Sequence, residues 1–153
     1  MRTNRIALSI LAAALTVGAT ACTPVLAMGS GGVQRPAANE FGQGPRASDK
    51  RLYSVTLQPL QPLQTFKLRQ LQTVPVLVTD ARGQPVEGAA IKVDGGMPEH
   101  GHGLPTQPRV SRSLGGGLYE IEGVRFSMGG WWELKLAIES PSGADSVTFN
   151  LSL

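Results

Sequence analysis

The sequence has little of the residue types on which catalytic or covalently stabilising chemistry often depends. Its 153 residues include one cysteine, two histidines and 5% aromatic residues. A single cysteine excludes a disulfide within the chain, so the fold needs an ordinary hydrophobic core or a ligand for its stability. The chain has no Gly-x-Ser-x-Gly motif, and only Glu99 is a carboxylate close to the histidines. We therefore expect no enzyme.

The sequence also lacks any run of lysine or arginine. Its formal net charge is +3, but Arg2 and Arg5 lie in a segment that we expect to be removed on export. Without them, 12 basic residues stand against 11 acidic ones, a net charge of +1. A basic surface for nucleic acid is therefore not expected.

The first 21 residues predict a secretion signal. Two arginines precede the apolar run from Ile6 to Val17, and small residues lead up to Cys22. The apolar run is too short to span a bilayer as a helix. Export into the periplasm is the expected consequence.

The residues around Cys22 leave two cleavage sites open. Ala19-Thr20-Ala21 before Cys22 resembles a bacterial lipobox, which predicts a lipoprotein signal peptide over residues 1–21 and lipidation of Cys22. Thr23 follows the cysteine, and by resemblance to bacterial lipoproteins the lack of Asp there indicates sorting to the outer membrane. Alternatively, Val25-Leu26-Ala27 offers small residues to an ordinary signal peptidase, which would remove the cysteine.

The mature chain divides into a flexible tether over residues 22–50 and one domain over residues 51–153. The tether is rich in Gly, Pro, Ala, Ser and Gln and has too few apolar residues to form a core. The domain has apolar residues with a period of two, separated by Gly, Pro and Asp turns, and no helical periodicity. This pattern predicts an all-β, immunoglobulin-like antiparallel β-sandwich. Strands are expected over residues 52–57, 74–79, 89–93, 118–124, 131–138 and 147–153.

The segment from Val93 to Pro108 contains both histidines and enough Gly and Pro to predict an irregular loop. His100 and His102, separated by Gly101, can present two imidazoles to one ion. Imidazole combined with methionine sulfur favours copper, particularly Cu(I). The alternative is structural, with the histidines hydrogen-bonded to the backbone and the methionines filling gaps in the core.

Two aromatic residues follow this region in the sequence. Trp131 and Trp132 are adjacent in an expected strand, so one should lie in the core and the other outside it, where it would border the same loop. The outer tryptophan would also suit a contact with a partner protein.

Three stretches together resemble the YtkA-like (FixH-like) family. They are Asp80 with Gly83–Ala89, Gly96–Thr106, and Gly117–Tyr119 with Gly123–Trp132. The resemblance covers roughly residues 74–153. It implies an exported or membrane-anchored immunoglobulin-like domain, some members of which are associated with copper handling and cytochrome oxidase assembly. It marks Met97, His100, His102 and Met128 as the candidate copper ligands.

The sequence leaves more than one function open. The first is a lipid-anchored domain that binds one copper ion for handling or delivery, with a metalloprotein or another envelope protein as partner. The second is a structural or protein-interaction module of the cell envelope with no metal. A small-molecule pocket inside the sandwich is a third.

Overall fold

The computed structural model describes residues 35–36, 39–59 and 65–153. The expected signal peptide, Cys22 and the first part of the expected tether lie outside the described residues. The described residues form one compact unit with its own hydrophobic core. Within the described ranges, no helix is long and apolar enough to span a membrane.

The described residues form nine β-strands and no helix. The strands are β1 (Arg46–Ala47), β2 (Tyr53–Leu57), β3 (Gln72–Asp80), β4 (Ala90–Met97), β5 (His102–Gly103), β6 (Arg109–Gly115), β7 (Leu118–Val124), β8 (Trp131–Ser140) and β9 (Gly143–Ser152). All of the pairings between them are antiparallel.

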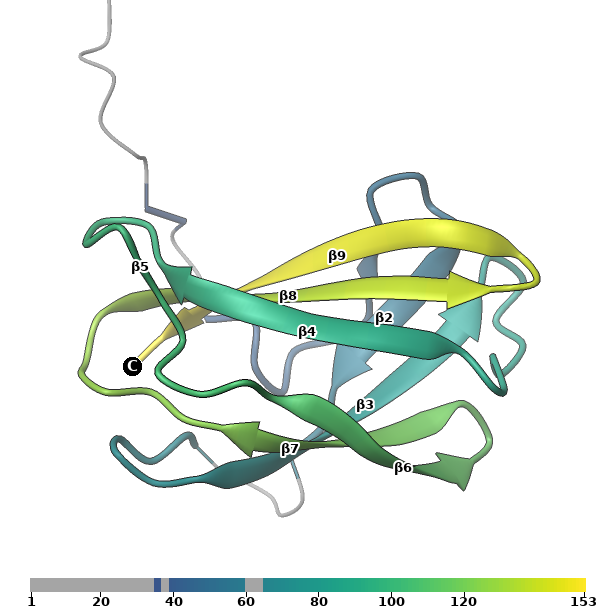
Figure 1. The fold of residues 1–153 in the computed structure, drawn as a ribbon. Helices are drawn as coiled ribbons and strands as arrows, with labels where there is room; N and C mark the ends of the chain where they lie inside the picture. The colour runs from purple at the N-terminus through teal and green to yellow at the C-terminus, as the bar shows by residue number, and fades with distance from the viewer. Residues whose placement is uncertain (1–34, 37–38, 60–64) are drawn as a thin grey trace, which may run out of the picture. The chain divides into compact units, whose positions relative to one another are not determined.

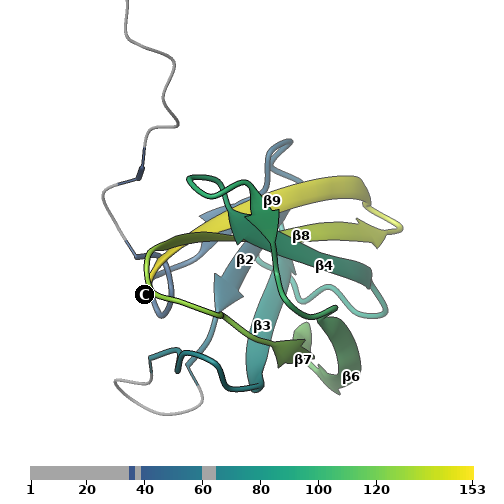
Figure 2. The ribbon, with the colours of Figure 1, turned by 60° about the vertical axis from the view of Figure 1, so that its left-hand side comes forward.

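The strands form two layers of one continuous sheet. Their order is β1-β2-β3-β7-β6-β4-β8-β9, with β5 beside β4. The pair Lys92–Arg109 connects β4 to β6, and the sheet folds over at this sparse junction. One layer holds β4, β8 and β9, and the other holds β2, β3, β6 and β7 (Figure 1). Figure 2 shows the space between the layers from another direction. The predicted all-β, immunoglobulin-like antiparallel sandwich is confirmed.

Alternating apolar residues create the core between the layers. In β8 the residues Trp132, Leu134, Leu136 and Ile138 are all buried, and the residues between them are more exposed. Trp131, at the start of the strand, is also buried. A strand buried on one face requires this period of two. Burying each large aliphatic side chain contributes roughly 2 kcal/mol before the entropy cost of folding.

The strand assignments differ from the sequence-based expectation in β4, which is longer than expected, and in β1, β5 and β6, which are additional strands. The irregular loop expected from Val93 is wrong in its first part, because β4 continues through Gly95 and Gly96 to Met97. Strand β6 was not expected, and most of its residues are exposed. A strand exposed on both faces has no hydrophobic alternation by which it could be recognised.

The structure also places residues 39–50, which the sequence assigned to the tether, against the sandwich. The Glu40 amide donates a hydrogen bond to the Asn150 carbonyl at 2.8 Å. Phe41 is buried, with its ring centroid 4.2 Å from that of Phe66. Long-range contacts therefore order a segment whose own composition predicts no structure.

Candidate functional site

The histidines lie at the end of the sandwich where β4 turns into β5. The carbonyl of Met97 accepts hydrogen bonds from the amides of His100 at 3.1 Å and Gly101 at 2.9 Å, which closes a tight turn. Gly101 has a φ of 65°, a left-handed conformation that glycine adopts without steric cost. The chain reverses within this turn, and Met97 pairs directly with His102 across the two strands.

Glycines allow β5 to lie close to β4. A Cβ atom on Gly96 would stand 2.5 Å from the carbonyl oxygen of His102. A Cβ atom on Gly95 would stand 2.3 Å from the carbonyl oxygen of Glu133 in β8. These distances are too short for any side chain, so Gly96 allows the close approach of β5 to β4 and Gly95 that of β8 to β4.

A hydrogen bond orients the ring of His102. Its Nδ1 lies 3.0 Å from the carbonyl oxygen of Gly103, which only accepts hydrogen bonds, so Nδ1 is the donor. Histidine ligands of metals are typically oriented by such a bond from the other ring nitrogen. In the neutral ring this arrangement would leave the lone pair of Nε2 for an ion.

The two imidazoles are close enough to share one ion. Their ring centroids are 6.0 Å apart, with an angle of 32° between the ring planes. A bond of about 2.0 Å from metal to nitrogen places each centroid about 3 Å from the ion, so two rings on one ion are at most about 6 Å apart. The observed separation is at this limit, so a shared ion would need the two donor nitrogens to face each other across it.

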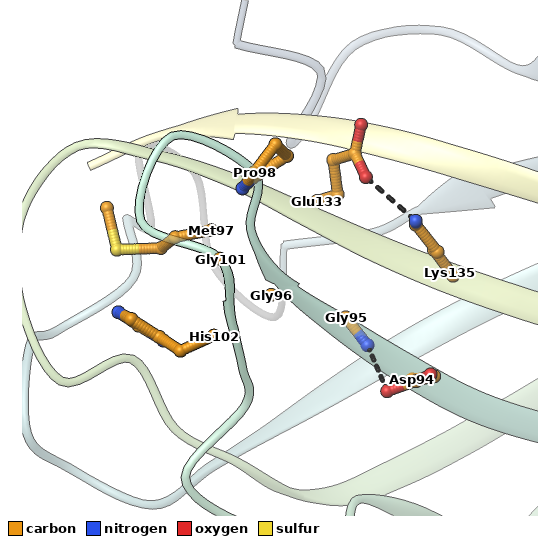
Figure 3. A pocket seen from close by; sticks show the side chains of 9 residues that line it. All are labelled: Asp94, Gly95, Gly96, Met97, Pro98, Gly101, His102, Glu133 and Lys135. Atoms are coloured by element: carbon orange, nitrogen blue, oxygen red, sulfur yellow. Dashed lines mark hydrogen bonds and ion pairs between the residues drawn. The ribbon is translucent and has the colours of Figure 1, made fainter. Parts of the chain in front are cut away.

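Met97 and Met128 occupy different surroundings at this end of the sandwich. Met97 is 1% exposed and belongs to the core cluster. Its side chain and the ring of His102 extend in the same direction from the paired strands (Figure 3). Met128 is 41% exposed in the loop between β7 and β8. The structure thus brings Met97 and His102 together and leaves Met128 on the surface.

Trp132 forms a wall of this region. Its ring centroid lies 5.5 Å from that of His102 in an edge-to-face arrangement, and its indole Nε1 donates a hydrogen bond to the Met128 carbonyl at 3.0 Å. The sequence predicted that one tryptophan lies in the core and one outside it, and Trp132 is the core residue. The tryptophan ring that contacts His102 is that of the inner residue, Trp132. Trp131 is outside the core cluster but only 4% exposed.

The carboxylates nearest the turn are engaged with cations. Glu99 pairs with Arg35 at 2.7 Å, and Glu133 pairs with Lys135 at 2.9 Å. Within the described parts of the chain, no group of three or more His, Cys, Asp or Glu residues could hold a metal ion. The donors on the paired strands are imidazole nitrogen and thioether sulfur, and the carboxylate of Asp94, which accepts a hydrogen bond from the Gly95 amide at 2.7 Å, lines the same region. An open hollow of about 260 Å³ lies beside them, lined in part by Met97 and His102 (Figure 3).

Comparison with known proteins gives one result. A family model described as YtkA-like matches residues 50–137, which covers β2 to most of β8 and includes all four candidate ligands. Two further comparisons, with curated proteins and with solved structures, give no match.

Proposed function

Because the chain belongs to the YtkA-like family, we propose that it is an exported domain that binds one copper ion for copper handling or delivery. The observation that carries this proposal is the pairing of Met97 with His102, with the His100 ring 6.0 Å from the His102 ring. His100 and His102 supply the nitrogen donors and Met97 supplies a thioether. Met128 is the fourth candidate ligand, and its exposed side chain is in the loop between β7 and β8.

The donor set favours Cu(I) over harder ions. Thioether sulfur is a soft ligand that suits Cu(I), whereas Mg²⁺ and Ca²⁺ require several oxygen ligands. Two neutral imidazoles and a thioether add no negative charge, so they match a monovalent ion. We propose binding rather than catalysis for this donor set.

The proposed location is the periplasm, with the domain attached to the outer membrane by a lipid on Cys22. The support is the sequence of the first 22 residues. An anchored copper-binding domain would exchange its ion with another metalloprotein of the cell envelope. Mass spectrometry of the mature protein tests the anchor, because a diacylglyceryl group on Cys22 and loss of residues 1–21 are expected.

A competition titration tests copper binding. The chain of residues 23–153 competes with a chromophoric chelator for Cu(I), and one equivalent of Cu(I) should transfer to the protein. A His100→Ala/His102→Ala double variant should lose this binding. Glu99→Gln is the matched control in the same turn, and it should keep the affinity because its carboxylate pairs with Arg35. Equal affinity in the wild type and the double variant would contradict the proposal.

Trp132 provides a second readout at the site. Its contact with the His102 ring predicts that bound copper quenches its fluorescence. Trp131→Phe removes the signal of the other tryptophan, so the remaining emission reports on the site. Quenching should saturate at one equivalent of Cu(I) and disappear in His102→Ala. Quenching that persists in His102→Ala would indicate nonspecific copper contact.

The burial of Met97 favours a second candidate function, a metal-free interaction module. Its terminal methyl packs so closely on Gly130 that a Cβ atom there would be 2.7 Å away. In this alternative Met97 only fills the core and the histidines stabilise the turn. A partner captured equally well by the wild type and by the His100→Ala/His102→Ala variant, in chelator and without it, would support this function.

A further inference from the structure

Exposed apolar side chains gather at the end of the sandwich that carries the histidines. Among the described residues, four large apolar side chains are exposed: Leu68 by 42%, Leu71 by 69%, Leu114 by 46% and Met128 by 41%. Leu114 is in β6 beside the hairpin to β7, at the opposite end (Figure 1). The other three lie in the segment before β3 and in the loop between β7 and β8. Contiguous exposed apolar patches are typical of surfaces that bind a protein or a membrane.

These two loops lie side by side. Leu68 forms a β-bridge with Phe126, and the Arg69 amide donates a hydrogen bond to the Phe126 carbonyl at 2.7 Å. The Nε of Arg125 donates a hydrogen bond to the Arg69 carbonyl at 3.3 Å. The three apolar side chains therefore come from neighbouring backbone segments.

The backbone of the first loop is also fixed from within. The side-chain oxygen of Gln72 accepts a bond from the Lys67 amide at 2.7 Å, and its Nε2 donates to the Lys67 carbonyl at 2.8 Å. Gln72 thus closes a small ring that includes Leu68 and Leu71. This hydrogen-bonded ring fixes the backbone of both leucines, whose side chains are exposed.

Positive charges accompany the leucines. Lys67, Arg69 and Arg125 belong to the same two loops, and none of them is in an ion pair with a carboxylate of the described residues. All 11 acidic residues of the chain are within the described ranges, so these cations have no acidic partner there. We call Lys67, Leu68, Arg69, Leu71, Arg125 and Met128 the basic apolar end.

The chain enters the domain at this end as well. Arg35 pairs with Glu99 in the turn between β4 and β5, next to the histidines. Twelve residues separate Cys22 from Arg35. Even fully extended they span at most about 45 Å. If Cys22 carries the lipid of the proposed function, the entry point of the chain is held within that distance of the bilayer.

We propose that the basic apolar end binds the surface of an anionic phospholipid bilayer. Leucine and methionine side chains insert at the boundary between headgroups and acyl chains, while lysine and arginine pair with lipid phosphates. A lipid surface fits because three cations outside the ion pairs of the described residues accompany the exposed leucines and Met128, and lipid phosphates complement that charge. Docking in this way turns the histidine turn toward the membrane, where a membrane-bound partner would meet the site. Only this last step depends on the proposed copper function and lipid anchor.

Vesicle cosedimentation tests the proposal with the chain of residues 23–153, which contains the complete core and no lipid. The protein should bind vesicles containing phosphatidylglycerol more tightly than vesicles of phosphatidylcholine alone. Raising NaCl from about 0.1 M to about 0.5 M should weaken binding, because the screening length falls from about 10 Å to under about 5 Å. Equal binding to both vesicle types, or no binding to either, overturns the proposal.

A pair of matched double variants locates the surface. Lys67→Gln/Leu71→Ser should lower the partition coefficient about fifty-fold, as the product of about fivefold for the cation and about tenfold for the leucine. The control Arg82→Gln/Leu114→Ser makes the same changes at exposed positions of the opposite end and should leave binding unchanged. Equal loss in both variants overturns the assignment. Cu(I) affinity should be the same in all three proteins, so a failure here is distinct from a failure of the copper proposal.

Discussion

Asp145 connects the last strand to the segment that precedes β2, and its replacement tests how that segment is held. The residue is 6% exposed, and its carboxylate accepts a hydrogen bond from the Ser48 hydroxyl at 2.5 Å. It also accepts bonds from the backbone amides of Lys50 at 3.0 Å, Leu52 at 3.2 Å and Ser146 at 2.8 Å. Four donors therefore converge on one buried carboxylate.

Asp145→Asn keeps the shape of the side chain and removes its charge. One carboxylate oxygen becomes an amide group, which faces hydrogen-bond donors and cannot accept from them. A hydrogen bond to a charged group contributes about 1.5–3 kcal/mol, so the variant should lose about 2–3 kcal/mol of unfolding free energy at pH 7. For a domain of this size the corresponding fall in Tm is about 10 °C. Asp49→Asn is the control, because Asp49 is exposed and accepts only the Ser146 hydroxyl within this network.

The contribution of Asp145 should depend on pH in a defined direction. Burial acts to raise the pKa of the Asp145 carboxyl, but hydrogen bonds from Ser48, Lys50, Ser146 and Leu52 outweigh it and lower the pKa from 3.8 to about 2. A group whose pKa is lowered by folding stabilises the protein above its unfolded pKa and loses that effect as the pH falls toward the folded value. The stability gap between the wild type and Asp145→Asn should therefore narrow between about pH 4 and pH 2. Thermal unfolding followed by circular dichroism measures both quantities, and a gap that is absent at pH 7 or constant down to pH 2 would refute the reasoning.

Three other substitutions test specific contacts. Tyr119→Phe removes a hydroxyl that donates to the Val86 carbonyl at 2.7 Å, and should cost about 1–2 kcal/mol in urea unfolding. Gly117→Ala should lower the unfolding free energy by more than about 2 kcal/mol or prevent folding, because its Cβ atom would lie 2.4 Å from a backbone oxygen and its φ is 74°. Gly116→Ala is the control: its Cβ atom would meet open space, so only its φ of 62° should reduce the stability, by about 1 kcal/mol. Met97→Leu should change stability by less than about 1.5 kcal/mol, but it should weaken Cu(I) binding about tenfold in the chelator competition, which corresponds to about 1.4 kcal/mol; unchanged Cu(I) affinity would assign this residue to the core alone.

The strands that were predictable from the sequence are those with one buried face. The alternation over residues 118–124 matches β7 residue for residue. The strand expected over residues 131–138 matches β8, which continues to Ser140. In these strands the alternation of apolar and polar residues in the sequence follows the alternation of buried and exposed side chains. Strand β6 carries no such pattern, because most of its side chains face solvent. Its place depends on hydrogen bonds to β7, which composition does not report.

The order of residues 39–50 was not predictable for a different reason. The contacts that hold them join residues far apart in the chain, and Ser48 and Asp145 are 97 positions from each other. Local composition, rich in Gly and Pro, describes only the cost of ordering this segment. The gain comes from partners in β9 that the local sequence does not contain.

The candidate site was predictable as a set of residues and only partly as an arrangement. The grouping of both histidines in one stretch is visible in the sequence. The direct pairing of Met97 with His102 was not, because Gly95 and Gly96 were interpreted as signs of a loop. Glycine in a strand can equally mark a close approach of another backbone, which is its role here.

The burial of the candidate ligands also constrains how a metal would be bound and released. Met97 and Trp132 belong to the packed core and their positions are fixed by it, whereas His100 and His102 are exposed on the turn. A site with a rigid base and an exposed side can bind an ion without refolding, and it leaves the ion open to attack by a ligand of another protein. While the ion moves from one protein to the other, ligands of both proteins would bind it, and the exposed histidines must therefore face the partner. The basic apolar end lies at the same end of the sandwich, so a domain docked through it would present the histidines to proteins in that membrane.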